Sequence, residues 1–210
     1  MMSVLFALLP AIANAQILKA WGLKAGVTSS AEALEWASAS SSHLSERRVG
    51  FIVGGFAEWS IFAPVSLLTE AQYKQGGSLQ QFYYEYNAPA TKWMFLNDWV
   101  DYISIPILVK VTVPFGLLTP YFFAGPRADF QVGFHRASPF GYPTYFPPYE
   151  DYRKVLLGGT VGAGVDLKQL LPFTLLAELS YDPDFTPPYS SDGYVTIHGN
   201  SYNLCIGVEF

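Results

Sequence analysis

The feature that most limits the possible folds of this chain is an alternation of apolar and polar side chains with a period of two residues. A period of two sends successive side chains to opposite faces of a β-strand. In residues 100–111 (VDYISIPILVKV), Ile103 and Ile107 lie on one face. Ser104 and Lys110 lie on the other face. This pattern predicts an all-β protein in which each strand has one apolar face.

The same alternation marks seven further segments, so the sequence predicts eight strands in total. These segments are residues 18–29, 48–62, 65–76, 119–134, 154–167, 173–182 and 201–210. The segment 48–62 is less regular than the others, because Ile52 and Phe56 fall on the face that otherwise carries small and polar residues.

The connections between the expected strands alternate in length along the chain. The short connections are Ala63–Pro64, Pro114–Leu118 and Lys168–Leu171, and the long ones are residues 30–48, 76–99, 135–152 and 183–199. Outer-membrane barrels have tight periplasmic turns and longer external loops, and a closed barrel satisfies every backbone group in lipid. The sequence therefore predicts an eight-stranded antiparallel up-and-down transmembrane β-barrel with short periplasmic turns and long extracellular loops.

The composition agrees with a membrane barrel. Charged residues make up 14% of the chain, against about 25% in an ordinary soluble domain. Apolar residues make up 50%, yet beyond the first part of the chain no apolar run approaches the roughly 20 residues that a membrane-spanning helix needs. The formal net charge of -5 argues against a nucleic-acid partner, since nucleic acid selects for basic surfaces.

Residues 1–15 (MMSVLFALLPAIANA) have the pattern of a secretory signal peptide. An apolar stretch precedes the small residues Ala13 and Ala15, which are typical of a cleavage site. Cleavage after Ala15 would leave residues 16–210 as the barrel domain, exported to the outer membrane. A short buried helix is the alternative interpretation, although Pro10 would interrupt it.

Most charged residues in the expected strands fall on the polar faces. An Arg or Lys on the lipid-facing side costs roughly 2 to 4 kcal/mol at the membrane midplane, so these faces are assigned to the barrel interior. The interior of a barrel of about eight strands is only wide enough for side chains to fill it. We therefore expect a plug of paired charges rather than an open pore, with proton or ion transport as the alternative. The expected interior network consists of Lys24, Glu58, Glu70, Lys74, Lys110, Arg127, Asp129, Lys154, Asp166, Glu178 and Glu209.

Two linked motifs lie between Asp101 and Gly133. An aromatic-x-x-Ile-Pro-x-Leu-x-Lys strand is followed by a turn and a Pro-Tyr-x-x-x-Gly-Pro sequence, formed by Tyr102, Ile105, Pro106, Leu108, Lys110, Pro120, Tyr121, Gly125 and Pro126. This arrangement resembles the PorT-like family of outer-membrane β-barrels. The resemblance implies an eight-stranded barrel in the outer membrane of a Gram-negative cell, and named members of that family assist protein secretion. The chain departs from the family at Leu179 and Ser180, where an Arg usually precedes a Tyr.

The chain ends in SYNLCIGVEF, an alternating run whose last residue is aromatic. Its apolar and aromatic positions are Tyr202, Leu204, Ile206, Val208 and Phe210. Resemblance to outer-membrane barrels implies that these residues form an assembly signal, recognised by the barrel assembly machinery. The terminal strand of a soluble sheet is the alternative interpretation.

The long loops are the best remaining place for a function. They are rich in Tyr, Phe, Trp and Pro, which supply rigid contact area at protein interfaces, although Tyr and Trp also form membrane-interface girdles. We expect a structural or partner-binding role in envelope or protein-secretion assembly, with outer-membrane lipid and lipopolysaccharide around the barrel. No cofactor or metal is expected, because His43, His135 and His198 lack metal-ligand spacing.

Two other functions remain open from the sequence. His43 and Ser45 have the His-x-Ser spacing of outer-membrane lipid A deacylases, in which a histidine activates a serine toward an ester. A soluble lipocalin-like carrier would instead point its apolar residues into a cavity. The leading interpretation is the barrel without catalytic activity.

Overall fold

The computed structural model describes residues 18–36, 43–44, 46–85, 91–113, 115–116, 118–137, 151–167, 173–191 and 195–210. The expected signal peptide, residues 1–15, and the expected turn at residues 168–171 lie outside these ranges. None of the described residues forms a helix that is long and apolar enough to cross a membrane.

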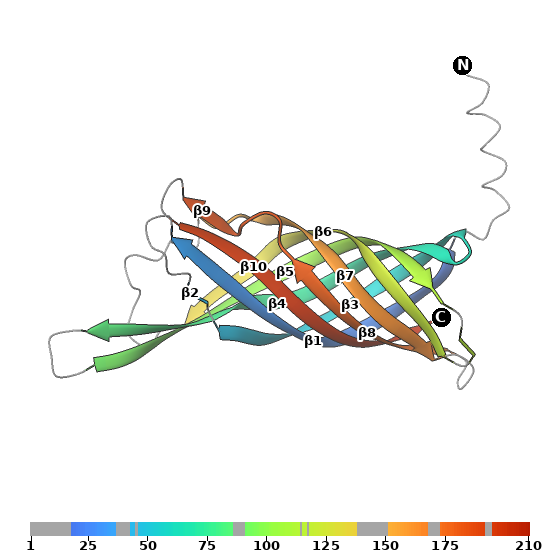
Figure 1. Ribbon diagram of the computed structural model, residues 1–210, viewed down its shortest axis with the longest axis horizontal. Coiled ribbons are helices and arrows are strands. Elements are labelled where there is room, and N and C mark those ends of the chain that lie inside the picture. The colour runs from blue at the N-terminus through green and yellow to red at the C-terminus, as the bar shows by residue number, and fades with distance from the viewer. Residues whose placement is uncertain are drawn as a thin grey trace, which may run out of the picture.

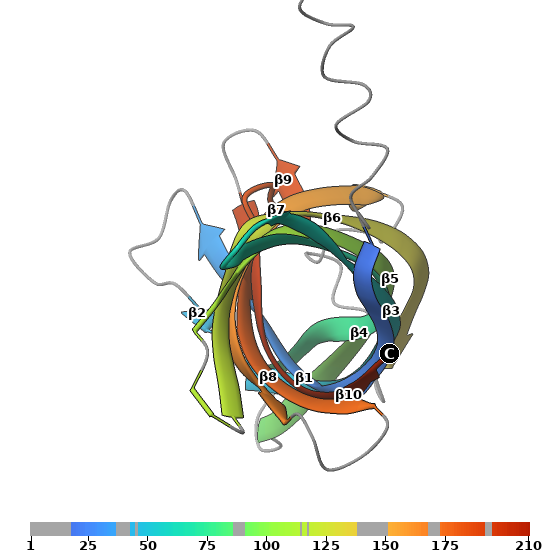
Figure 2. The same ribbon diagram turned by 90° about the vertical axis from the view of Figure 1, so that its right-hand side faces the viewer.

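The described chain forms one closed antiparallel barrel, which Figure 2 shows end-on as a ring of strands. Its eight strands are β1 (Leu18–Trp36), β3 (Glu46–Phe62), β4 (Val65–Glu85), β5 (Thr91–Thr112), β6 (Leu118–Ala137), β7 (Val155–Leu167), β8 (Thr174–Pro183) and β10 (Val195–Glu209). Each strand pairs with the next, and β10 pairs with β1 to close the ring. Two short strands, β2 (His43–Leu44) and β9 (Tyr189–Ser191), extend the sheet beside β1 and β10. The fold predicted from the alternation is confirmed.

Both ends of the described chain lie at the same end of the barrel (Figure 1). The Phe210 amide donates to the Trp21 carbonyl at 2.8 Å, and the Trp21 amide donates to the Phe210 carbonyl at 3.3 Å. Barrels of this class have both termini on the periplasmic side. We therefore call this the periplasmic end, and the end with the long connections the extracellular end.

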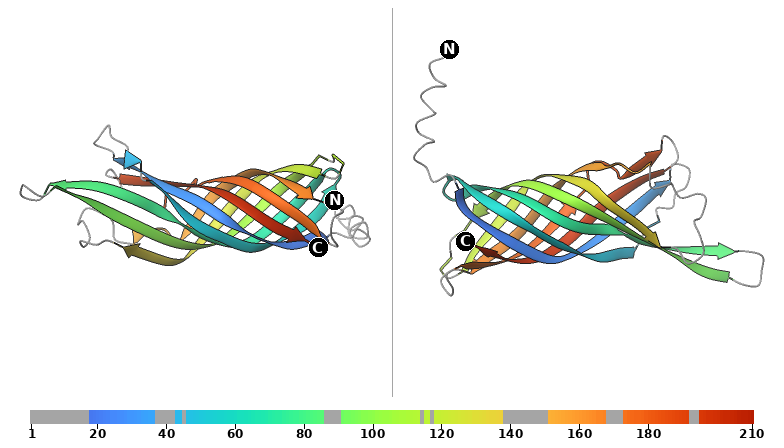
Figure 3. Two further views of the ribbon diagram at one scale, coloured as in Figure 1. Left: turned by 90° about the horizontal axis from the view of Figure 1, so that it is seen from below. Right: turned by 180° about the vertical axis from the view of Figure 1, so that it is seen from behind.

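The strands extend further at the extracellular end than the sequence pattern predicts. Residues 76–99 were expected to be a loop, but β4 continues to Glu85 and β5 begins at Thr91. Together these strands form a hairpin that projects beyond the rest of the barrel (Figure 3). The loop prediction was wrong because Tyr, Phe and Trp, which mark this region, also favour extended strands.

The outer face of the barrel is apolar and bounded by aromatic residues. On β10, Leu204 and Ile206 are 55% and 69% exposed, whereas the intervening Cys205 is buried. The Trp21 and Phe210 rings pack together at 5.0 Å near the periplasmic end, and the Tyr181 and Tyr202 rings pack at 4.9 Å further along the strands. Such an outward apolar band between aromatic girdles is the surface that a barrel presents to lipid.

The inner face holds an apolar layer that the sequence analysis did not predict. Phe56, Leu68, Leu108, Tyr121, Phe123 and Leu176 form this buried cluster. Its aromatic rings lie over glycines on the neighbouring strand, because Tyr121 pairs with Gly164 and Phe123 pairs with Gly162. A Cβ on either glycine would lie 2.4 Å from the ring of its partner. These glycines therefore provide the space in which the rings pack.

Candidate functional site

Most of the charged residues that the sequence assigns to the interior are buried inside the barrel. The buried ones are Lys24, Glu58, Glu70, Lys74, Lys110, Arg127, Asp129, Asp166 and Glu178. Glu209 is half-buried near the periplasmic end. Lys154 is exposed. It lies just before Val155, the first residue of β7, so the alternation of inward and outward side chains in that strand does not extend to it. Its assignment to the interior was wrong.

The cluster nearest the periplasmic end is centred on Lys110 of β5. Its Nζ lies 2.9 Å from Glu58 Oε2 and 3.4 Å from Asp166 Oδ2. The ammonium also lies 4.0 Å from the centroid of the Tyr121 ring, which is a favourable cation–π position. Ser66 Oγ donates a hydrogen bond of 2.7 Å to Glu58 Oε1. Lys110 therefore links β3, β5 and β7 across the interior.

A second cluster, centred on Lys24 of β1, lies further from the periplasmic end. Lys24 Nζ donates to Glu70 Oε1 at 2.7 Å and to Glu178 Oε2 at 2.6 Å. The Tyr121 hydroxyl donates to the other oxygen of Glu178 at 2.9 Å. Tyr121 thus belongs both to the apolar layer and to this cluster, and it connects the two.

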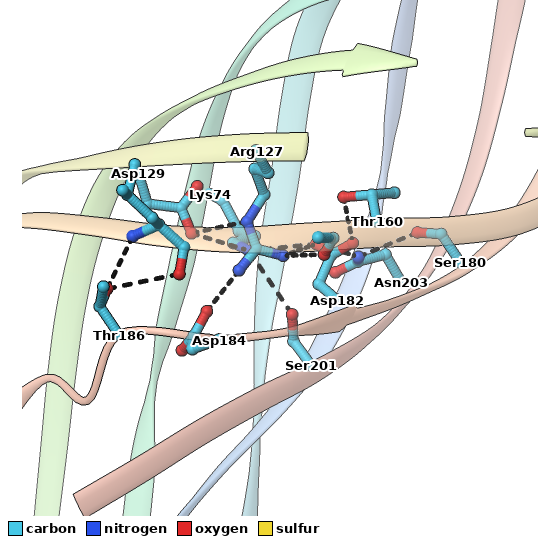
Figure 4. Close-up of polar contacts among 12 residues, drawn as sticks. Lys74, Arg127, Asp129, Thr160, Ser180, Asp182, Asp184, Thr186, Ser201 and Asn203 are labelled. Carbon is cyan, nitrogen blue, oxygen red and sulfur yellow. Dashed lines mark hydrogen bonds and ion pairs between the residues drawn. The ribbon is translucent and has the colours of Figure 1, made fainter. Parts of the chain in front are cut away.

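The third cluster, which we call the outer cluster, lies towards the extracellular end and is drawn in Figure 4. Arg127 contacts three carboxylates: its Nε lies 2.9 Å from Asp129, its Nη1 lies 3.0 Å from Asp182, and its Nη2 pairs with Asp184. Lys74 Nζ lies 3.2 Å from Asp182 and 3.6 Å from Asp129. Two cations therefore share three carboxylates from β6, β8 and the segment after β8.

Asp182 is the most heavily bonded carboxylate of the outer cluster. Besides its two cationic partners, it accepts hydrogen bonds of 2.8 Å from Thr160 Oγ1 and from Asn203 Nδ2. Buried charges satisfied in this way hold their strands in register, and loss of one partner leaves the other uncompensated. Asp182 is therefore held by two cations and two neutral hydrogen-bond donors inside the barrel.

A small cavity of about 30 Å³ lies beside the outer cluster. Thr28, Glu32, Lys74, Tyr102 and Asp129 are among the residues that line it. Thr28 Oγ1 and Asp129 Oδ1 are buried and accept or donate no hydrogen bond within the described chain. The volume is suited to about two water molecules, which such unsatisfied groups commonly bind. No group of His, Cys, Asp and Glu among the described residues is arranged to hold a metal ion.

Among the described residues, four buried or partly buried acids of the interior were not in the predicted network. They are Glu32, Asp98, Asp182 and Asp184. Glu32, Asp98 and Asp184 were placed in long loops, although Glu32 and Asp98 actually lie within β1 and β5. A signal for Glu32 was present, since the alternation of β1 continues past Thr28 and Ser30 to that residue.

The proposed assembly signal lies on the outer face of β10. Tyr202, Leu204, Ile206 and Phe210 are exposed, and Val208 is half-buried. Its recognition by assembly machinery stays a prediction.

One member of the pair considered for ester hydrolysis lies outside the described residues. His43 lies in β2, where its backbone pairs with that of Leu34 in β1. Ser45 lies outside the described ranges. Residues 138–150 of one aromatic-rich loop also lie outside them.

Comparisons with known proteins agree with this architecture. Residues 14–187 match the model of the family described as "Outer membrane protein beta-barrel domain". No curated protein matches the chain in sequence.

Among solved structures, the chain is similar to a major outer membrane protein from Thermus thermophilus, with a TM-score of 0.51 and 14% identity over 89% of this chain and 98% of the other. It is also similar to the outer membrane protein OprG from Pseudomonas aeruginosa, with a TM-score of 0.49 and 9% identity over 92% and 97% of the two chains. A further similar structure is Ail, the attachment invasion locus protein of Yersinia pestis, with a TM-score of 0.44 and 12% identity over 91% and 98%.

Proposed function

Since this chain belongs to the outer membrane protein beta-barrel domain family, we propose that it is a closed, non-enzymatic barrel that binds a protein partner outside the cell. The protein is located in the outer membrane. The partner is a secreted or surface protein, and the β4–β5 hairpin is the element that holds it. Resemblance of residues 101–133 to the PorT-like family supports a role beside protein secretion.

The observation that carries this proposal is the pairing of the β4–β5 hairpin. Among described residues, β4 is last paired with β3 at Leu79, and β5 is last paired with β6 at Asn97. Beyond these positions β4 and β5 pair only with each other, as far as Glu85 and Thr91. The outer edges of this part of the hairpin therefore carry backbone N–H and C=O groups without a strand partner in the described part of the chain. An extended segment of another protein recognises such groups by strand addition.

The filled interior supports a function at the surface rather than through the barrel. Lys24, Lys110 and Arg127 each bridge carboxylates from at least two other positions around the wall. Between the Lys110 and Lys24 clusters lies the apolar layer that includes Leu68 and Leu108. Both kinds of layer occupy the path that a solute would take.

Excision of the hairpin tests the proposal. Leu79 and Asn97 are directly opposite each other, so residues 80–96 are replaced by Asn-Gly, a sequence favoured in two-residue hairpin turns. The excised protein is expected to fold normally, as measured by heat-modifiable gel mobility. It is expected to lose the chemical cross-links that the wild-type protein forms to a partner on intact cells.

A matched control replaces residues 138–150 with a Gly-Ser linker and leaves the hairpin intact. Cross-links are expected to persist in this control. Persistence of the same cross-links after excision of the hairpin, in a protein that still folds, would contradict the proposal. Loss of the cross-links only in the control would also contradict it.

A further inference from the structure

Two adjacent arginines, Arg47 and Arg48, lie near the extracellular end of β3, where the pairing of β3 with β4 shifts register. Such a shift interrupts the alternation of faces, so both guanidinium groups reach partners on the outer face. The Arg47 guanidinium carbon lies 4.6 Å from the centroid of the Tyr202 ring, and that of Arg48 lies 4.8 Å from the Trp99 ring. Tyr202 is 50% exposed on the lipid-facing side of β10. Trp99 precedes the buried Val100 and so points outward from β5.

Arg47 is exposed but held in place by neighbouring strands. Its Nε donates to Ser29 Oγ at 3.0 Å, its Nη1 donates to Asn200 Oδ1 at 2.8 Å, and its Nη2 donates to the Ser29 carbonyl. A guanidinium has five N–H donors, so one hydrogen on each Nη atom remains for another acceptor. The side chain is therefore preorganised, with donors still available.

Arg48 is held in a similar way by residues of β4, whereas Arg47 is held by residues of β1 and β10. Its Nη1 donates to the Gly76 carbonyl at 3.0 Å, and its Nη2 donates to Gln75 Oε1 at 3.3 Å. Asp101 on the same face accepts a hydrogen bond of 3.3 Å from Gln75 Nε2.

Neither arginine has a carboxylate partner among the described residues within the 4.0 Å that defines an ion pair. The interior cations behave differently, since Lys24, Lys110 and Arg127 each pair with at least two carboxylates. Arg47 is therefore left without an ion-pair partner from the described chain, and Arg48 is attracted to the nearby Asp101 carboxylate without forming a direct ion pair with it.

The height of these arginines on the barrel is that of the lipid headgroups. On β1 the outward side chains are apolar from Trp21 to Val27 and become polar at Ser29, which Arg47 contacts. Trp21 and Ser29 are eight residues apart on β1. At a rise of about 3.4 Å per residue, on a strand tilted by about 40° from the barrel axis, this separation spans about 21 Å along the axis. This span approaches the roughly 25 Å apolar band of outer-membrane barrels, so Ser29 lies close to the outer boundary of the membrane.

We propose that Arg47 and Arg48 bind the phosphorylated headgroup of a lipid in the outer leaflet. Guanidinium groups bind phosphate through paired, charge-assisted hydrogen bonds, and Arg is favoured over Lys at such sites. Tyr202 and Trp99 pack beside the two guanidinium groups, at the depth where amphipathic rings contact headgroups. This inference does not depend on the partner proposed for the hairpin.

Binding of lipid A to the full-length protein in nonionic detergent tests the proposal, with native mass spectrometry as the measurement. The probes are lipid A, dephosphorylated lipid A and inorganic phosphate. The variants are the double substitution Arg47→Gln/Arg48→Gln and the control Arg153→Gln. Arg153 is exposed just before β7, which lies across the ring from β3. Heat-modifiable mobility verifies that every variant is folded.

The wild-type protein is expected to bind lipid A about tenfold more tightly than its dephosphorylated form. The double variant is expected to lose this preference, and Arg153→Gln to keep it. Equal binding of the two lipids by the wild type, or an unchanged preference in the folded double variant, would overturn the proposal. Binding of inorganic phosphate as tight as that of lipid A would indicate a free-anion site and would overturn the lipid assignment.

Discussion

Lys24 and Glu178 are 154 residues apart in the chain, yet Lys24 Nζ donates a hydrogen bond of 2.6 Å to Glu178 Oε2 inside the barrel. The two residues lie on β1 and β8, which are separated in the ring by β10. Their contact therefore spans the position where the last strand of the chain joins the first. Closure of the barrel and pairing of these charges depend on each other.

Replacement of Lys24 is expected to destabilise the barrel strongly. Lys24→Met leaves Glu70 and Glu178 buried without their shared cation, which typically costs about 3 to 5 kcal/mol. The free energy of unfolding in detergent, measured by denaturant titration, checks this expectation. Lys154→Met, at an exposed position, is the control and should change the free energy of unfolding by less than about 0.5 kcal/mol. Similar losses in both variants would contradict enclosure of the Lys24 cluster.

The effect of replacing Arg127 is expected to depend on pH. Arg127→Met leaves Lys74 alone among Asp129, Asp182 and Asp184, so at pH 7 the variant should unfold at a lower denaturant concentration than the wild type. Burial raises the pKa of Asp184, which lies just after β8, so this carboxyl takes up a proton as the pH falls and its repulsion in the variant is removed. The difference between the unfolding midpoints of the two proteins should therefore shrink between pH 7 and pH 4. A difference that is constant or grows as the pH falls would show that carboxylate repulsion is not its cause.

The alternation in sequence was sufficient to predict the barrel and the side of the wall on which most charges lie. A period of two fixes the face of each residue once a strand is located, so Lys24, Glu70 and Glu178 were all assigned inward correctly. It does not fix which of them meet. That depends on the register of neighbouring strands around the ring, which involves residues far apart in the chain.

The errors arose where strand ends had to be located. Lys154 lies just before β7 and is exposed, whereas Glu32 lies in a part of β1 that was assigned to a loop. Asp184 follows Pro183 at the end of β8, and no local pattern shows that it turns inward to Arg127. The apolar layer was missed because the inward position of Phe56 was read as irregular alternation.

The space at Gly164 is expected to be essential for packing of the apolar layer. A Cβ there would lie 2.4 Å from Tyr121 Cζ, and the Tyr121 ring is fixed by its hydrogen bond to Glu178. Gly164→Ala should lower the free energy of unfolding by about 1 to 3 kcal/mol. Gly55→Ala is the matched control, because the nearest atom to its Cβ is 3.5 Å away. An effect of Gly55→Ala as large as that of Gly164→Ala would contradict this explanation.

The terminal aromatic residue is expected to act mainly during insertion. Phe210→Ser keeps the backbone hydrogen bonds to Trp21 and removes the ring contacts with Trp21 and Phe173, each of which is worth about 0.5 to 1.5 kcal/mol. We expect the amount of inserted protein in cells to fall several-fold, while the protein refolded in detergent loses only this small stability. Cys205→Ser, at a buried position on the same strand, should have little effect on insertion. Normal insertion of Phe210→Ser in cells would contradict the prediction that Phe210 is part of an assembly signal.

The central claim is that buried ion pairs and the apolar layer close the interior, so that the protein acts at its outer surface. Current through the purified wild-type protein in a planar lipid bilayer tests this claim most directly. The bridges from Lys24, Lys110 and Arg127 predict no stepwise conductance above the baseline of the bilayer. Stable, uniform conductance steps from the folded wild-type protein would contradict the claim.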